Sequence, residues 1–397
     1  MRSPTKNRTL ERVISSMSTE DVDDDINTPQ ALIEVVLSND TESIKEFLNQ
    51  NNYDINIQCH TGKTAIFIAC HRGNLEVVDI LIEKRANLDI KKNNGETPLS
   101  IACQLNKIDV VLALIKGGAN LNLAIDDNET PLFIACKNNN LVIVNHLITA
   151  KVNLDEETIL RKETPLLRAC RNSNIDIAND LINAGAALNE GNIFKETPFF
   201  IACSNNNINI VNHLINARAD LDQGNIFGET PLFIACMSGY TNIVKALIKG
   251  KVDGSKVDLN LSDSHDQTPL YKACEHGHFG VVKQLIEAKA NLNQATRSGL
   301  TPIFIASQRN NLECVEALFN AGASVKCLTE GGNFFGTQIN RKLKGVSEEM
   351  TTLIETITKK ENIKDRYEAL KNLAQARPSP DPSHAEARPA KATRGRY

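Results

Sequence analysis

Cysteine is the residue whose type and spacing most plainly suggest chemistry in this chain of 397 residues. Seven of the ten cysteines recur at steps of 33, 33, 34, 33, 33 and 38 residues. Such a row could be a ladder of metal ligands, a redox device, or a small core residue repeated in a regular fold. The seven are Cys70, Cys103, Cys136, Cys170, Cys203, Cys236 and Cys274. The choice depends on the elements that carry them.

Each of these cysteines closes a copy of one octapeptide, of which ETPLFIAC at 129–136 is typical. The threonine predicts a helix cap, the proline suits the first turn of a helix, and the apolar-Ala pattern that follows predicts two helical turns. A second helix follows, with apolar pairs at helical spacing such as Val110 and Val111 with Leu114. The threonines of the eight copies are Thr64, Thr97, Thr130, Thr164, Thr197, Thr230, Thr268 and Thr301.

The two helices of a unit are separated by residues that tolerate left-handed backbone, such as Asn139-Asn140. A unit of 33 residues that opens T-P-L-x-x-A and closes G-A-x-L-N resembles the ankyrin repeat, and the resemblance covers roughly residues 27–357. It implies an all-α, ankyrin-type helical solenoid of stacked helix-turn-helix repeats with short β-hairpin fingers. Eight full repeats are recognisable, and the degenerate units at both ends are expected to act as caps.

The segments outside the array are short. We expect residues 1–26 to be a disordered N-terminal segment, 358–376 to include a C-terminal helix, and 377–397 to be a disordered tail rich in Pro, Ala and Arg. Neither side of the array leaves the roughly 50 residues that a catalytic domain needs. No nucleotide-binding, hydrolase or kinase motif is present. The sequence therefore predicts a protein that is not an enzyme and has no cofactor.

The repeat settles the interpretation of the cysteines. Equivalent positions on adjacent helices lie about 8–10 Å apart, whereas a disulfide needs Cα atoms closer than about 7 Å. We therefore predict that the cysteines are small core residues. Cys59-His60 beside Cys70-His71, and Cys274 with His276 and His278, remain as candidate zinc ligands, which the absence of any C-x-x-C pair disfavours.

The composition of the chain limits the classes of partner that we expect it to bind. A net charge of -4 argues against a nucleic-acid binder. No stretch approaches the roughly 20 apolar residues needed to cross a membrane. Ten cysteines without an export signal favour the cytoplasm, with the nucleus as an alternative. We expect a monomer that binds a protein.

Two surfaces are candidates for that binding. Positions four and seven residues past the threonine share one face of the first helix, and the resemblance implies that this face lines a concave groove. Lys137, Arg168 and Arg171 form a basic cluster there, with no acid among the neighbours on that face. It predicts a site for an acidic partner segment. The alternative is a solvated face whose charges have no partner.

The second candidate surface lies in the fingers. Two successive fingers read G-N-I-F, which places Ile193-Phe194 and Ile226-Phe227 three and four residues before the threonine, where other units have mostly polar residues. Exposed, they would form an apolar interaction patch; the alternative is that the rings fold back onto neighbouring fingers. Lys162 and Lys195 replace the usual Gly, Asn or Asp, so we expect bent or strained fingers there.

The sequence as a whole predicts a non-catalytic protein-protein interaction scaffold that uses the concave groove and the finger tips. One alternative is an adaptor that recruits substrates to a larger enzyme complex through a terminal element. Another is an ankyrin-repeat effector of an intracellular bacterium or parasite, with which the Asn- and Ile-rich repeats are compatible.

Overall fold

The computed structural model describes residues 29–50, 54–250, 256–325 and 347–360. Within these ranges the chain forms helices, turns and loops, and no strand. The predicted disordered segments 1–26 and 377–397 lie outside the described residues, as does the predicted C-terminal helix beyond residue 360. The chain divides into two compact units, residues 1–291 and 292–397, which are considered separately.

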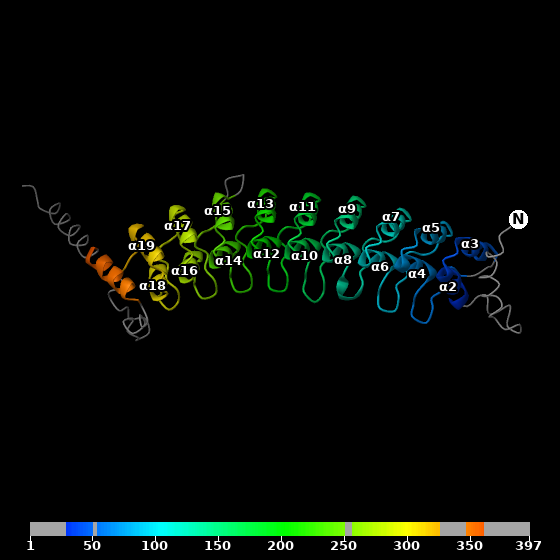
Figure 1. Cartoon of the computed structure of the whole chain (residues 1–397), viewed down its shortest axis with the longest axis horizontal. Helices are drawn as coiled ribbons and strands as arrows, with labels where there is room; N and C mark the ends of the chain where they lie inside the picture. Colours follow the sequence, from blue (N-terminus) through cyan, green and yellow to red (C-terminus); the bar gives the residue numbers. More distant parts are fainter. Residues whose placement is uncertain (1–28, 51–53, 251–255, 326–346, 361–397) are drawn as a thin grey trace, which may run out of the picture. The chain divides into compact units, whose positions relative to one another are not determined.

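In the described part of the first unit, the helix pair α2 (Pro29–Ser38) and α3 (Thr41–Gln50) is followed by seven more helix pairs. The first helices of these pairs form one row, and the second helices form another row above it (Figure 1). The first row contains α4 (Ala65–Arg72), α6 (Pro98–Gln104), α8 (Pro131–Lys137), α10 (Pro165–Arg171), α12 (Pro198–Ser204), α14 (Pro231–Met237) and α16 (Pro269–Glu275). The second row contains α5 (Leu75–Glu83), α7 (Ile108–Lys116), α9 (Leu141–Thr149), α11 (Ile175–Asn183), α13 (Ile208–Asn216), α15 (Thr241–Lys249) and α17 (Phe279–Glu287).

The threonine of the repeat starts the first helix of a pair as predicted. Thr130 is buried, and its hydroxyl accepts a hydrogen bond from the backbone N–H of Phe133 at 3.2 Å. Pro131 occupies the first turn, where its missing N–H leaves no helical hydrogen bond unmade. The helix that follows packs against its neighbours α6 and α10 on either side and against α9 above.

The inter-helix turn uses its two residues differently. Asn139 adopts the left-handed conformation with φ 57°. Asn140 does not; instead its side-chain oxygen caps α9 by accepting from the Ile143 N–H at 3.2 Å. Only the first residue of the Asn-Asn pair therefore needs to tolerate positive φ. The second needs a short side chain that can accept a hydrogen bond.

The Leu-Asn element at the end of each repeat links successive units. The side-chain oxygen of Asn122 accepts from the backbone N–H of Asn153 at 2.9 Å, and that of Asp155 accepts from the Ala187 N–H at 2.8 Å. Asn189 does the same for the Asp220 N–H at 2.9 Å. This ladder ties neighbouring repeats through polar loops that helix packing does not reach, and it accounts for part of the high Asn content.

The fingers are hairpin turns that do not extend into strands within the described residues. A typical finger is closed by the Asn192 N–H donating to the Glu196 carbonyl at 3.1 Å. Lys162 and Lys195 have φ values of 51° and 58°, in the same left-handed region as Gly62 and Gly228 in other fingers. These two fingers therefore keep the common turn, and the strain is confined to one backbone angle.

The second unit contains α18 (Pro302–Gln308), α19 (Leu312–Asn320) and a helix over 348–360. Met350 and Ile357 of this last helix are buried. The helix runs without a break past residue 357, where the sequence placed the end of the array. Ser307, which replaces the cysteine in this repeat, is buried and donates its hydroxyl to the Ile303 carbonyl at 2.8 Å.

Candidate functional site: the finger tips and the ion-pair network beside them

The two predicted Ile-Phe pairs are exposed. Ile193 and Phe194 keep 47% and 46% of their surface accessible, and Ile226 and Phe227 keep 48% and 54%. The rings are therefore not buried against neighbouring fingers, whereas core side chains such as Phe133 keep 1% of their surface accessible. Four large apolar side chains are presented to water on adjacent fingers.

A polar side chain inside each finger fixes the position of the tip. The buried Asn192 accepts hydrogen bonds from the backbone N–H groups of Phe194 and Glu196 at 2.8 and 3.0 Å, and it donates to the Glu196 carboxylate at 2.7 Å. Asn225 makes the same three contacts in the next finger, at 2.9, 3.1 and 2.8 Å. The apolar pairs therefore sit on preformed turns, so little ordering is needed when a partner binds.

A third finger carries an apolar pair that the sequence reasoning missed. Ile159 and Leu160 precede Ile193 and Phe194 by one repeat and are 71% and 73% exposed. This repeat is one residue longer than its neighbours, so counting back from Thr164 placed the pair out of register. The 34-residue step in the sequence is the signal that could have revealed it.

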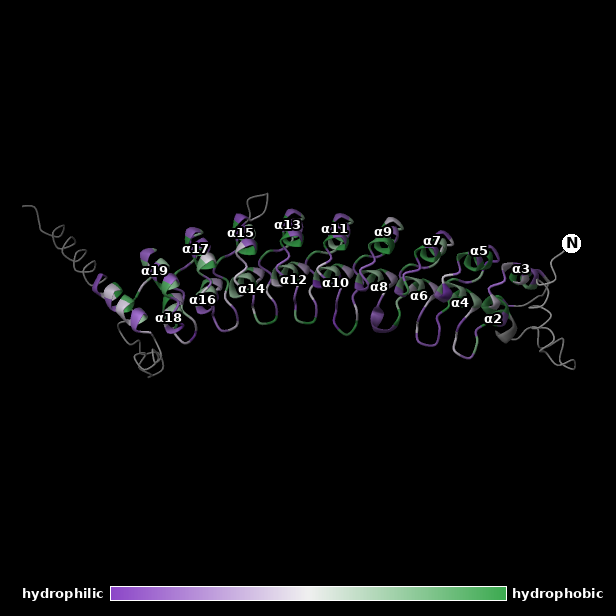
Figure 2. Ribbon diagram, viewed as in Figure 1, coloured by the Kyte–Doolittle hydropathy of each residue, from purple (hydrophilic) through white to green (hydrophobic). Residues whose placement is uncertain are grey.

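Backbone hydrogen bonds join the three tips. The Ile193 N–H donates to the Arg161 carbonyl at 3.1 Å, and the Ile226 N–H donates to the Phe194 carbonyl at 2.9 Å. The loops preceding α10, α12 and α14 accordingly carry hydrophobic segments at their lower ends (Figure 2). We call these six side chains the apolar finger stripe: Ile159, Leu160, Ile193, Phe194, Ile226 and Phe227.

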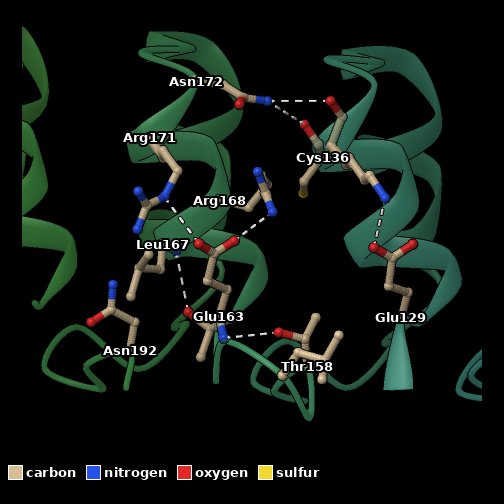
Figure 3. A network of polar contacts seen from close by, with 12 residues as sticks. Glu129, Cys136, Thr158, Glu163, Leu167, Arg168, Arg171, Asn172 and Asn192 are labelled. Carbon is tan, nitrogen blue, oxygen red and sulfur yellow. Dashed lines mark hydrogen bonds and ion pairs between the residues drawn. The ribbon is translucent and has the colours of Figure 1, made fainter. Parts of the chain in front are cut away.

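The predicted basic cluster is not a surface of free cations. Arg168 Nη2 lies 2.5 Å from Glu163 Oε2, and Arg171 Nε lies 3.0 Å from Glu163 Oε1 (Figure 3). Lys137 Nζ lies 2.6 Å from Glu129 Oε1. The expectation of a cluster without acids was wrong because it considered only the face of the first helix, whereas both acids directly precede the threonine caps.

Glu163 is the centre of this network. Its side chain is almost completely inaccessible, and its backbone is held by Thr158, whose hydroxyl accepts from the Glu163 N–H at 3.1 Å. Within the described residues its carboxylate oxygens are held by ion pairs and make no well-directed hydrogen bond. Arg168 also lies over the ring of Phe133, at 5.3 Å from the centroid. A buried carboxylate with two arginines is thus built into the packing between α8 and α10.

A pocket of about 350 Å³ joins the two predicted surfaces. Its lining includes the tip residues Ile193 and Phe194 together with Arg171 and Glu163 of the ion-pair network. Arg171 also reaches the next repeat, with its Nη2 at 3.6 Å from Glu196 Oε2. The remaining lining residues are Arg161, Asn192 and Glu196. The lining therefore combines apolar side chains with two arginines and two glutamates.

The recurring cysteines lie in the core, as predicted. All seven are fully buried on the first helix of their repeat. Burial raises the pKa of the Cys170 thiol to about 12 and raises the pKa of the Cys136 thiol well above its ordinary value. These groups are therefore neutral small hydrophobes at physiological pH.

The candidate zinc ligands are not brought together. Cys70 is buried, whereas Cys59 is half-buried in a finger with its Sγ 3.0 Å from the Thr61 hydroxyl. His278 contacts the Met237 carbonyl through Nε2 at 3.0 Å and stacks on His276. In the ranges that the structure covers, no three His, Cys, Asp or Glu side chains gather as a metal site would require.

Comparison with known proteins agrees with the fold. The family model for ankyrin repeats matches residues 32–125, 117–192, 181–258 and 252–328. A solved ankyrin repeat domain from Acinetobacter baumannii is 30% identical, covers 49% of this chain and 98% of its own, and has a TM-score of 0.46. The ankyrin repeat domain of Bcl-3 is 24% identical, covers 57% of this chain and 99% of its own, and has a TM-score of 0.50.

No curated protein sequence matches the chain. Across the described residues, no helix has both the length and the apolar content required for a membrane span. The family match covers most of the chain, and the fold contains the paired helices, capped turns and fingers that the match implies. The chain belongs to the ankyrin repeat family.

Proposed function

We propose that this protein is a non-catalytic interaction scaffold that binds a partner protein through the apolar finger stripe. The observation that carries the proposal is the exposure of three adjacent apolar pairs on rigid, hydrogen-bonded turns. Contiguous exposed apolar groups on a protein surface mark interaction sites. Large apolar side chains, and aromatic rings in particular, contribute much of the binding energy when a partner covers them.

The groove beside the stripe has a secondary part in this proposal. Lys137, Arg168 and Arg171 already hold carboxylates, so they do not present unpaired positive charge to an acidic segment. We assign Arg171 a role in lining the 350 Å³ pocket, into which a partner side chain can insert next to Phe194. Repeat arrays of this family are generally protein-interaction modules, which supports a protein rather than a small molecule as the ligand.

The free thiols support a reducing compartment, so we propose that the protein acts as a monomer in the cytoplasm or the nucleus. The adaptor alternative depends on a folded element over 360–376, of which only residue 360 is described. It therefore gains no support from the structure, and the scaffold function is preferred.

Affinity capture from the source cell's lysate tests the proposal. The full chain is compared with Phe194→Ala/Phe227→Ala, and the captured proteins are identified by mass spectrometry. The matched control is Val142→Ala/Phe279→Ala, which removes two exposed apolar side chains from α9 and α17. We expect the finger variant to lose a protein that the control retains, with melting temperatures unchanged in both. Identical capture by all three proteins would refute the proposal.

A further inference from the structure

Two of the three finger tips that carry the apolar stripe are also positively charged. The three tips span residues 159–162, 193–195 and 226–228, and their charged side chains are Arg161, Lys162 and Lys195. All three are exposed. None of them forms an ion pair or a side-chain hydrogen bond with any residue that the structure describes, unlike Arg171 and Lys137 beside them. The stripe therefore presents unpaired positive charge together with apolar surface.

The charge changes sign at both ends of the stripe. The preceding tip contains Asp126 and Asp127, and the following tip contains Asp266. Figure 2 shows the hydrophilic 3₁₀ turn η2 (Asp126–Asn128) in the loop before α8, next to the hydrophobic tips. The apolar and positive surface is therefore limited to three fingers. A partner that matches this surface needs an apolar and negatively charged segment no longer than those three fingers.

The backbone supports a role for two of these cations. Lys162 and Lys195 adopt left-handed φ values at a position that is glycine in several fingers, such as Gly95 with φ 82°, and Asn128 or Asp266 in two others. A side chain in this conformation strains the backbone, and glycine would relieve the strain. Strained residues are often found at binding sites, where the side chain is needed in spite of the strain.

The spacing expected between successive apolar pairs favours a helical partner segment over an extended one. Successive pairs are one repeat apart, and helices packed side by side are about 8–10 Å apart. An α-helix returns to the same face after seven residues, a rise of about 10.5 Å. A β-strand returns to the same face every two residues, about 6.8 Å, so its spacings of about 6.8 and 13.6 Å match less well.

The pocket between the second tip and α10 adds a specific contact. Arg161 and Arg171 both line it, next to Ile193 and Phe194. The Arg171 contact with Glu196, at 3.6 Å, is longer than its contact with Glu163, at 3.0 Å. A carboxylate from a partner can compete for this guanidinium while an apolar side chain of the same partner fills the pocket.

We propose that the apolar finger stripe is a receptor for an acidic amphipathic α-helix of a partner protein. Its apolar residues, seven apart, meet the three tips in turn, and its flanking carboxylates pair with Arg161, Lys162 and Lys195. Charge complementarity over a bounded surface and the match of the helical repeat to the spacing of the fingers carry this assignment. It rests on the proposed function, because it assumes that the stripe binds a protein.

A designed peptide tests the proposal directly. The probe is a fluorescein-labelled, alanine-rich helix with three leucines spaced seven residues apart and glutamates on both flanks, titrated with the full chain by fluorescence anisotropy. Its charge-swapped form has lysines in place of the glutamates. A third form keeps the acidic composition but has a central proline, which breaks the helix. We expect the acidic helix to bind at least about tenfold more tightly than either control peptide, and more weakly as salt is raised.

Protein variants locate the binding surface. We expect Lys162→Glu/Lys195→Glu to weaken binding of the acidic helix by about tenfold or more. Lys151→Glu is the matched control, because Lys151 is exposed and also left-handed, with φ 60°, but lies in the turn after α9 and not in a finger. We expect this control to bind as the parent does.

Three results would overturn the inference. The charge-swapped helix could bind as tightly as the acidic helix, or the proline-containing peptide could do so. Lys151→Glu could also weaken binding of the acidic helix as much as Lys162→Glu/Lys195→Glu does. If any of these occurs while Phe194→Ala/Phe227→Ala still abolishes capture of a lysate protein, the stripe binds a partner of different chemistry and the proposed function stands. If the finger variant also captures normally, the proposed function fails as well.

Discussion

Replacing Glu163 with glutamine probes the most unusual electrostatic feature of the array. The carboxylate is fully buried and lies 2.5 Å from Arg168 and 3.0 Å from Arg171. Glutamine keeps the shape of the side chain and removes its charge. Arg168 is then left without an anionic partner, and Arg171 retains only the 3.6 Å contact with Glu196. The folded state therefore carries the cost of one partly buried, uncompensated cation, Arg168, and of a second, Arg171, that is compensated only by the longer contact.

The expected loss of stability follows from the burial of the three groups. Removing one partner from a fully buried ion pair costs about 3–5 kcal/mol. The Arg168 and Arg171 side chains are 19% and 33% exposed, so water compensates part of their charge. We expect Glu163→Gln to lower the free energy of unfolding by about 2 kcal/mol.

Glu129→Gln is the matched control. Glu129 occupies the same position before the threonine cap, but its partner Lys137 is 47% exposed. Exposed pairs contribute about 0.2–1 kcal/mol, so we expect a loss of about 0.5 kcal/mol.

Urea unfolding of the full chain, followed by far-ultraviolet circular dichroism, measures both changes. A double-mutant cycle of Glu163→Gln with Arg168→Met isolates the pair, and we expect a coupling energy of about 1 kcal/mol or more. Equal losses for Glu163→Gln and Glu129→Gln, with no coupling, would refute the reasoning. Burial of the carboxylate would then contribute nothing beyond a surface ion pair.

Three further outcomes are expected. Burial raises the pKa of the Cys59 thiol, but hydrogen bonds from Thr61 and Lys63 outweigh it and leave the pKa below its ordinary value. Cys327 lies outside the described residues and is therefore replaced by serine in this test. In that background Cys59 should react with a thiol reagent at lower pH than a free cysteine does, and residual native reactivity in Cys59→Ser would contradict the burial of the other described cysteines. Lys195→Gly should raise the free energy of unfolding in urea by about 0.5–1 kcal/mol by relieving the left-handed φ, and a decrease would show that the strain is absent. Thr230→Ala should lower the free energy of unfolding in urea by about 1 kcal/mol, because the Phe233 N–H loses its acceptor at 3.1 Å. An unchanged free energy would show that the cap contributes nothing to stability.

The sequence predicts those features that depend on residues close together in the chain. Thr130 and Pro131 mark the start of a helix because capping is local, and the buried position of Cys136 follows from its place two turns later. The sequence placed Ile193 and Phe194 in a finger but left open whether neighbouring fingers cover them, because that depends on contacts between repeats. Regular repeats make such local rules reliable, since each unit packs only against the next.

Two features of the site depend on contacts that helical periodicity does not describe. Glu163 precedes α10 and approaches Arg168 and Arg171 only once the finger turns back under the helix. Reading along one helix face therefore found the arginines and missed the carboxylate. Ile159 and Leu160 were missed because the extra residue of their repeat shifts them relative to the threonine.

Site-specific photo-crosslinking tests the central claim most directly. Benzoylphenylalanine is placed at Phe194 in one protein and at Phe279 in another, since both rings are exposed but only Phe194 belongs to the stripe. After irradiation in the source cell's lysate, the account predicts that position 194 forms a crosslink to a specific protein and that position 279 does not. A crosslink to the same protein from position 279, with none from position 194, would show that the partner binds elsewhere on the array.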